Sequence, residues 1–470
     1  MALLVLALSV SSILSQENTE KTKMIIEVIR HGARVPVYPV GNDTAWTKGL
    51  QSGDLTPIGL RQHYLLGKEM VKKYSNFFSG DLAYDEFYVR SSGYQRTVLS
   101  AIAHLSGMWN HFDSFQLSFQ DNDVRVLPPT VMTSTTTNFR TPLPKGYLPD
   151  AIHSDEQEKD ILLAALSSRN CPKINAISQK MSDQLTKEME GKADFKAKVE
   201  EAAQRYGYKL DAKKPYLDNC REIADFAIQD VRNNPNPKIK ADEAIYKFLQ
   251  RCAEGHMVHR YTDPSIRKVV VSDLLREIVG KLKLKANSTQ NNNLKYQLYS
   301  GHDSTILPVL GVVEAVDVDC YMKDLRESTF TPECKGFPDT ASNLVFELLQ
   351  TGEDQDTKLF VRMSYNFEEI DVCKLKNKDD RYRCPLDTFA TTVLSRVVAD
   401  QANDCGVAKA PTRLPQKKPS SPWRKYSWIA IFVAAFLFIG LIALCTVGNN
   451  RKRSSSAIYY IDPDRSSLNK

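Results

Sequence analysis

Residues 24–36 read MIIEVIRHGARVP, an apolar run that ends abruptly in the polar sequence RHGAR at residues 30–34. The apolar and β-branched residues of the run predict a short buried strand over Met24 to Ile29. His31 then stands between two arginines, and nearby positive charge favours the neutral, nucleophilic form of an imidazole. Two guanidinium groups can also hold the oxygens of a phosphate while the imidazole attacks phosphorus. The segment therefore predicts a phosphate site at the end of a strand.

Two other polar motifs stand where a predicted strand gives way to a loop or a helix. The sequence YQLY at 296–299 runs into SGHD at 300–303, and RSSGYQRT at 90–97 leaves a strand and enters a helix. A helix N-terminus favours an anion, because its backbone N–H groups have no partner within the helix. Ligands of open α/β sheets bind outside the carboxyl ends of strands. We therefore predict one composite site built from three segments that are far apart in the sequence.

Strand and helix patterns alternate along the first part of the chain. Thr56 caps a predicted helix with Pro57 in its first turn, and a second helix is predicted from Gly93 to Trp109. Alternation of this kind favours an α/β fold whose sheet is covered on both faces. The predicted strands are 24–29, 86–89, 124–127, 295–299, 343–349 and 358–363.

The composition changes between residues 142 and 267. Strand signals vanish there, and helical stretches rich in Lys, Glu and Ala take over, as at 174–190 and 194–205. We interpret 142–267 as a mainly helical cap inserted into an α/β core formed by 23–141 and 268–406.

Both ends of the chain carry apolar segments. Residues 1–16 have the length of a signal peptide, with a buried N-terminal helix as the alternative. Residues 427–448 are predicted to form a transmembrane helix, preceded by a Pro- and Lys-rich stalk at 407–426 and followed by a cytoplasmic tail at 449–470. Basic residues flank both sides of the span, so the cleavable leader decides the orientation. The expectation is a single-pass type I membrane protein.

The cysteines agree with an exported chain. Of nine cysteines, Cys445 lies in the predicted span, and the other eight are even in number, which predicts disulfides without fixing their pairing. They show no C-x-x-C spacing of a zinc site. The sequons at Asn42 and Asn287 predict a glycoprotein. The net charge of +6 is spread along the chain, so we expect no nucleic-acid partner.

Taken together, the motifs resemble those of the histidine acid phosphatase family, a branch of the phosphoglycerate-mutase-like superfamily, and its animal-type members in particular. RHGARVP at 30–36 looks like the family's R-H-G-x-R-x-P signature, and LTPIGLRQ at 55–62 looks like L-T-x-x-G-x-x-Q. RSSGYQRT at 90–97 resembles R-S-T-D-x-x-R-T, from which Gly93 and Gln95 depart. GHD at 301–303 resembles the H-D pair, and RNCP at 169–172 is typical of the animal-type enzymes. The resemblance covers most of residues 23–406.

The resemblance implies a phosphoglycerate-mutase-like fold, with a central mixed sheet flanked by helices and an inserted helical cap. It implies a membrane-anchored acid phosphatase that hydrolyses phosphomonoesters through a phosphohistidine. His31 would be the nucleophile and Asp303 the proton donor. The phosphate would be bound by Arg30, Arg34, Arg96 and His302. We expect no metal or cofactor, since the arginines supply the positive charge.

Several alternatives stay open at this point. A more selective phosphatase of the same superfamily, acting on inositol phosphates or a lysophospholipid, is one; a catalytically inactive receptor or adhesion ectodomain is another. The ectodomain could face the lumen of the lysosome or endomembranes, or the cell surface, and a homodimer is one of the open oligomeric states. Arg90 and Glu27 are interpreted as structural, because a strand-terminal arginine commonly pairs with a carboxylate and Glu27 lies inside a strand.

Overall fold

The computed structural model describes residues 20–40, 49–79, 85–109, 151–165, 170–287, 292–352, 357–375 and 380–407. Several predicted features lie outside these residues: the leader at 1–16, the strand at 124–127, the sequon at Asn42, the membrane helix at 427–448 and the tail at 449–470. The chain divides into units 1–408 and 409–470, and the described residues belong to the first. Within them, no helix has the length and apolarity needed to span a bilayer.

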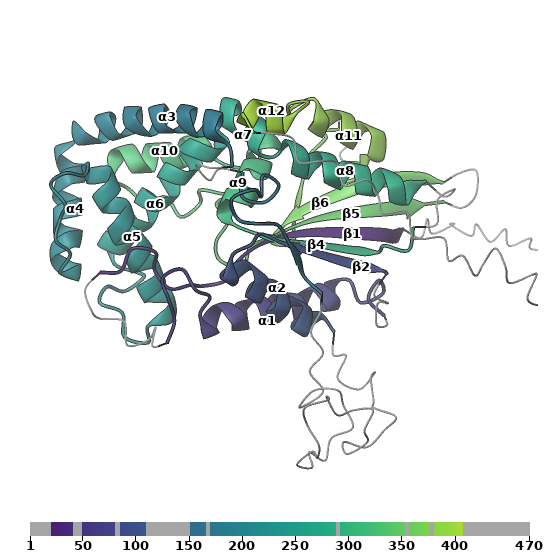
Figure 1. The fold of residues 1–470 in the computed structure, drawn as a ribbon, viewed down its shortest axis with the longest axis horizontal. Helices are drawn as coiled ribbons and strands as arrows, with labels where there is room; N and C mark the ends of the chain where they lie inside the picture. The colour runs from purple at the N-terminus through teal and green to yellow at the C-terminus, as the bar shows by residue number, and fades with distance from the viewer. Residues whose placement is uncertain are drawn as a thin grey trace, which may run out of the picture. The chain divides into compact units, whose positions relative to one another are not determined.

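A mixed sheet forms the centre of this unit (Figure 1). Its strand order is β3-β2-β4-β1-β5-β6-β7, and β8 pairs with β6. Neighbours among β1 to β4 run parallel, whereas β5, β6, β7 and β8 join antiparallel, so the prediction of a mixed sheet is confirmed. The bounds are β1 Lys21–Arg30, β2 Phe87–Ser91, β3 His153–Ser154, β4 Tyr296–Gly301, β5 Asn343–Thr351, β6 Lys358–Tyr365, β7 Glu368–Ile370 and β8 Cys384–Pro385.

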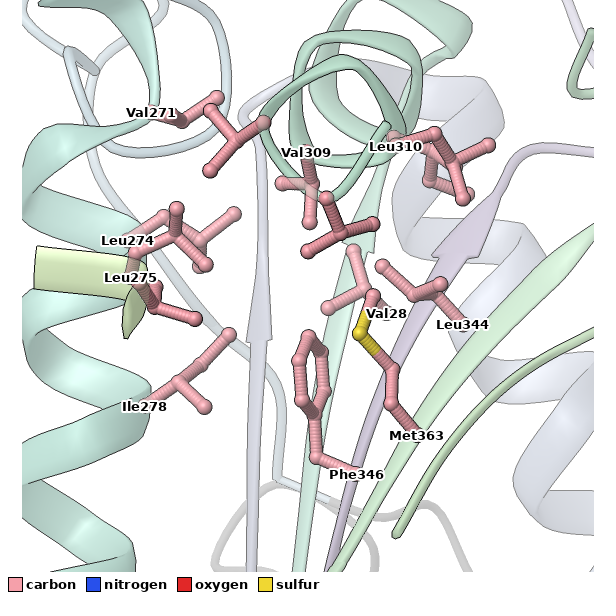
Figure 2. Close-up of a cluster of buried hydrophobic side chains, with 14 of the residues drawn as sticks. Val28, Val271, Leu274, Leu275, Ile278, Val309, Leu310, Leu344, Phe346 and Met363 are labelled. Carbon is pink, nitrogen blue, oxygen red and sulfur yellow. The ribbon is translucent and has the colours of Figure 1, made fainter. Parts of the chain in front are cut away.

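Strand β1 is buried on both faces of the sheet. Met24, Ile26 and Val28 pack into one cluster, while Ile25 and Ile29 pack into another on the opposite face. Successive side chains of a strand point to opposite faces, so a continuous apolar run is what a doubly covered strand requires. Figure 2 shows the first cluster, in which Val28 lies among side chains of β5, β6 and two helices.

Helices cover both faces of the sheet (Figure 1). One face carries α1 (Pro57–Lys73) and α2 (Gln95–Met108), and the other carries α8 (Ser272–Ala286), α9 (Asp303–Val312) and α11 (Leu386–Leu394). The short helices α7 (Pro264–Val270) and α12 (Gln401–Cys405) contact each other beside this second layer. The expected coverage of both faces is therefore present.

The starts of α1 and α2 can be compared with the predicted ones. Thr56 is the N-cap of α1, and its hydroxyl accepts a hydrogen bond from the Gly59 amide at 3.2 Å, as predicted. Helix α2 begins at Gln95 instead of Gly93, and its N-cap, Tyr94, makes no capping hydrogen bond through its side chain. The predicted start at Gly93 was therefore two residues too early.

A separate group of helices, apart from those that cover the sheet, has its own apolar core, which we call the helical core. It contains α3 (Pro172–Glu190), α4 (Ala193–Tyr206), α5 (Tyr216–Asn233) and α6 (Ala244–Thr262), whose buried side chains include Phe195, Tyr206, Phe226 and Phe248. Helix α10 (Val318–Glu327) adds Met322 and Leu325 to the same core, although it lies beyond the range predicted for the insert. The helical core is therefore built from two separate stretches of the chain.

The structure gives the disulfide pairing that could not be determined from the sequence. The pairs are Cys171–Cys405, Cys220–Cys252, Cys320–Cys334 and Cys373–Cys384. Cys220–Cys252 joins α5 to α6 within the helical core, and Cys171–Cys405 joins the start of α3 to the end of α12.

Candidate active site

The three polar motifs meet at one edge of the sheet, because β4 lies between β1 and β2. Arg30 at the end of β1 pairs with Gly301, and Ser91 at the end of β2 pairs with Ser300. Just beyond the strands, the His31 amide donates to the Gly301 carbonyl at 3.0 Å. Residues 30–34, 90–97 and 300–303 thus form one site, at the carboxyl ends of three parallel strands.

His31 is buried, with 3 % of its surface exposed. Its Nδ1 lies 2.9 Å from the carbonyl oxygen of Gly32, which can only accept a hydrogen bond. Nδ1 therefore carries the proton, and Nε2 keeps its lone pair. Burial, followed by the charges of Arg96 and Arg30, lowers the pKa of His31 well below its ordinary value. The imidazole is thus held neutral, with one nitrogen available as a nucleophile.

Side chains from three helices fix the backbone that follows His31. The amide of Gly32 donates to Ser100 Oγ at 3.1 Å, the amide of Ala33 to Gln62 Oε1 at 2.8 Å, and the amide of Arg34 to Gln229 Oε1 at 3.2 Å. These three acceptors lie on α2, α1 and α5 respectively. Hydrogen bonds from three different helices therefore fix the loop that carries His31 and Arg34.

Gly32 has a steric reason to be glycine. A Cβ at this position would lie 2.5 Å from the carbonyl oxygen of Gly59 and 2.6 Å from its Cα. Two glycines therefore allow the loop after β1 to touch the first turn of α1, and a larger residue at either position would push them apart.

Two of the arginines at the site have fixed partners. Arg30 donates to the Pro338 carbonyl at 2.5 Å and pairs with Asp303, with 2.7 Å between Nη2 and Oδ2. Arg34 pairs with Asp225, with 2.5 Å between Nη2 and Oδ1. Burial would lower the pKa of Arg34, but the Asp225 carboxylate outweighs it and raises that pKa. Burial lowers the pKa of Arg30, although the Asp303 carboxylate opposes that shift. Both guanidinium groups are thus oriented by carboxylates.

Arg96 differs from these two, because it pairs with no carboxylate among the described residues. Its guanidinium carbon lies 4.5 Å from the centre of the Tyr94 ring, and its buried Nε has no hydrogen-bond partner in the same residues. Burial, together with the charge of Arg34, lowers its pKa to about 10. A buried cation without a counterion is a strong attractor for an anion.

His302 completes the group of residues around His31. The two ring centres are 5.5 Å apart, and Ser92 Oγ lies 2.9 Å from His302 Nε2. The His302 amide donates to Thr305 Oγ1 at 3.0 Å, which anchors the residue at the start of α9. Burial and the charges of Arg96 and Arg30 lower the pKa of His302 well below its ordinary value.

Arg90 and Glu27 have structural partners, as expected. Arg90 pairs with Asp155 at 2.8 Å and with Asp160 at 3.2 Å. The carboxylate of Glu27 is fully buried and accepts hydrogen bonds from Tyr296 at 2.7 Å and Asn343 at 2.8 Å, and His104 Nε2 lies 3.1 Å from it. These groups hold neighbouring strands together.

Sequence reasoning missed several residues that shape the site. Ser92 and Gln62 stand inside the recognised motifs, so their positions could have suggested a role. Asp225 and Gln229 lie on α5, within a stretch whose only visible pattern is that of an amphipathic helix. No signal in the sequence connects them to residues 30–34.

The chain is similar in sequence to a family of known proteins. The sequence matches the family described as "Histidine phosphatase superfamily (branch 2)" over residues 21–366. Prostatic acid phosphatase of Bos taurus is 25% identical over 402 residues, which cover 83% of this chain and 88% of that protein. Lysosomal acid phosphatase of Xenopus laevis is 26% identical over 312 residues, covering 65% of this chain and 64% of that protein.

Solved structures share the fold at lower identity. Klebsiella sp ASR1 phytase aligns with a TM-score of 0.55 at 15% identity, covering 84% of this chain and 100% of its own. The multiple inositol polyphosphate phosphatase of Bifidobacterium longum, solved with phosphate, aligns with a TM-score of 0.55 at 13% identity, covering 83% and 96%.

Proposed function

Because the chain belongs to branch 2 of the histidine phosphatase superfamily, we propose that it is an acid phosphatase that hydrolyses phosphomonoesters through a phosphohistidine intermediate. One observation carries the proposal: a neutral, buried His31 whose Nε2 is free lies among three guanidinium groups. A metal-independent phosphoryl transfer needs these two elements, a nucleophile and fixed positive charge for the oxygens.

The reaction runs in two steps. In the first, His31 Nε2 attacks phosphorus, the bond from phosphorus to the leaving oxygen breaks, and Asp303 gives that oxygen a proton. In the second, a water attacks the phosphohistidine, Asp303 takes a proton from the water, and phosphate leaves. Arg30, Arg34, Arg96 and His302 hold the three equatorial oxygens through both steps.

The pair between Arg30 and Asp303 supports the role of Asp303. The carboxylate lies 2.7 Å from a guanidinium that we assign to phosphate binding, so it lies beside the place where the leaving oxygen would be.

A more selective activity is the second candidate. The fold resembles that of phytases and of an inositol polyphosphate phosphatase, which fits an inositol phosphate as substrate. A lysophospholipid is the other substrate that the sequence left open for a selective phosphatase. The presence of every residue that the mechanism requires opposes an inactive receptor ectodomain.

We further propose that residues 1–16 are a leader and that residues 427–448 anchor the enzyme in a membrane, with its catalytic unit in the lumen of the lysosome or endomembranes, or at the cell surface. Four disulfides support synthesis in an oxidising compartment.

The proposed function is tested by assaying the purified full-length protein in detergent against aryl and alkyl monoesters, inositol phosphates and lysophosphatidate, from acidic to neutral pH. We expect hydrolysis of several monoesters with an optimum at acidic pH. Preference for one inositol phosphate or lysophospholipid by about 100-fold or more in kcat/KM, as sites built for one substrate achieve, would instead select that alternative. If none of these compounds is hydrolysed, the result would favour a catalytically inactive receptor or adhesion ectodomain.

The pH profile gives a second prediction. Burial, followed by the charges of Arg96 and Arg30, holds the pKa of His31 low, so the nucleophile stays neutral as the pH falls. Replacing Arg96 with glutamine removes one of these charges, which raises the pKa of His31 and moves the acid limb of kcat/KM to higher pH. We also expect a loss of about 10²- to 10³-fold in kcat/KM, because a contact to the transition state is lost.

The control is Arg61→Gln, which removes a charge from the exposed surface of α1. Both variants are compared with the original enzyme on the same substrate, so that titration of the substrate cancels. An acid limb that stays in place or moves to lower pH in Arg96→Gln would contradict the assigned electrostatics.

A further inference from the structure

Helix α5 presents a row of polar side chains, one per turn, to the loop that follows β1. Asp225, Gln229 and Asn233 are spaced four residues apart, so they lie on one face of the helix. Gln229 accepts from the Arg34 amide at 3.2 Å, and the Asn233 side-chain amide donates to the Arg34 carbonyl at 3.4 Å. The helical core therefore reaches the active-site loop through this row.

Asp225 makes the closest contacts of the row. One carboxylate oxygen accepts from Arg34 Nη2 at 2.5 Å, while the other accepts from the amides of Val37 at 2.6 Å and Tyr38 at 3.2 Å and lies 3.5 Å from Arg34 Nη1. The side chains of Arg34 and Asp225 are 14 % and 13 % exposed. A single, largely desolvated carboxylate thus binds both a guanidinium and the backbone three and four residues beyond it.

The geometry also shows which edge of the Arg34 guanidinium is occupied. Its bonds to Asp225, and a further bond from Nη1 to the Val35 carbonyl at 3.0 Å, use the Nη1 and Nη2 end of the group. The edge formed by Nε and the second N–H of Nη2 carries none of these bonds. Because a guanidinium is planar and rigid, fixing one edge fixes the direction of the other.

We propose that Asp225 is a positioning residue for phosphoryl transfer: it aims the free edge of Arg34 at the phosphate and, through α5, couples the helical core to the catalytic loop. The proposal rests on the function proposed above, since the direction of Arg34 matters only if this site binds a phosphate. A misplacement of about 1 Å in such a contact can cost about 10²-fold in rate.

A purely stabilising ion pair is the competing explanation, and α5 supplies a matched control. Asp230 lies on the same helix, is buried, and accepts from the side chain of Asn234 at 2.8 Å and the amide of Lys238 at 3.0 Å. Among the residues that the structure describes, it pairs with neither Arg34 nor the loop after β1. Asp230→Asn therefore perturbs the stability of α5 without touching the guanidinium.

The test is a double-mutant cycle between Asp225→Asn and Arg34→Ala, read as kcat and KM for an aryl phosphate and as the Kd of inorganic phosphate. Melting temperatures of every variant are measured alongside. If Arg34→Ala cannot be purified, Arg34→Gln replaces it. Asp225→Asn should lower kcat/KM by about 10- to 100-fold while Arg34 is present. It should change kcat/KM by less than about twofold once Arg34 is gone, because the two residues act as one unit.

Asp230→Asn should leave kcat/KM within about twofold in both backgrounds, whatever its melting temperature. Two results would overturn the positioning role. One is an Asp225→Asn substitution that lowers kcat/KM by the same factor with and without Arg34. The other is an Asp225→Asn enzyme as active as the original. The Kd of phosphate separates this outcome from failure of the proposed function. A chain that binds phosphate and hydrolyses nothing fails only as an enzyme, and the cycle in Kd still decides whether Asp225 acts through Arg34.

Discussion

Replacing His31 with alanine should lower kcat for any phosphomonoester by at least about 10⁴-fold, the largest effect expected of a single substitution in this chain. The reason is chemical, because the proposed mechanism assigns the attack on phosphorus to the Nε2 lone pair of His31 and the binding of oxygen to the other site residues. The arginines would still hold the substrate, so KM should change much less than kcat.

The measurement is a rapid quench of the enzyme with a monoester labelled in its phosphoryl group, at acidic pH. The original enzyme should carry label that survives base and is released by acid, as expected for a phosphoramidate. His31→Ala should carry none. The control is His153→Ala, which removes an exposed histidine of the same sheet. Undiminished label in His31→Ala would rule out His31 as the nucleophile.

Replacing Asp303 with asparagine should have the second largest effect, and its size should depend on the leaving group. An alkoxide leaves only when protonated, so hydrolysis of an alkyl monoester should slow by about 10²- to 10⁴-fold. A 4-nitrophenolate needs no proton, so the first step should change by less than about tenfold. If Asp303 also serves as the base for water, the second step becomes limiting and nitrophenolate appears in a burst.

Stopped-flow kinetics with the two substrates make this comparison within one variant. Asp317→Asn is the control, because Asp317 caps α10 and makes no contact with the site. An Asp303→Asn enzyme that hydrolyses the alkyl monoester at the original rate would show that another group donates the proton.

The edge of the sheet that carries the site could be predicted from the sequence. Each of the three strands is an apolar run that stops at a polar motif, and buried parallel strands show themselves by such continuous runs. The carboxyl ends of parallel strands share one edge, so Arg30, His31 and His302 had to come close once the strands were found.

Other elements had no local signal. Strand β3 has two residues, both exposed, and exists because the chain passes beside the end of β2. Helix α10 looks like any amphipathic helix, and only tertiary packing assigns it to the helical core. Asp225 could not be predicted as a site residue either. Its partner Arg34 lies 191 residues away in the sequence, and only the folded chain brings the two together.

The two departures from the family pattern have a structural reason. A Cβ at Gly93 would lie 2.7 Å from the carbonyl oxygen of Asp155, so the aspartate that is usual there would not fit without a shift of that backbone. Gln157 donates to the Gly93 carbonyl at 2.6 Å, and Gln95 accepts from the Leu55 amide at 2.9 Å. Both positions are adapted to their neighbours and leave Arg96 in place.

The position of β4 between β1 and β2 has a consequence for how the enzyme matures. Both outer strands are synthesised early, whereas β4 follows only after helices α3 to α8 have been made. Until β4 inserts, the amides of His31 and Ser92 lack the carbonyls of Gly301 and Ser300. Pairing across such sequence distances is slow. Catalytic competence is therefore acquired late, and a phosphate ligand stabilises the completed fold over every earlier intermediate.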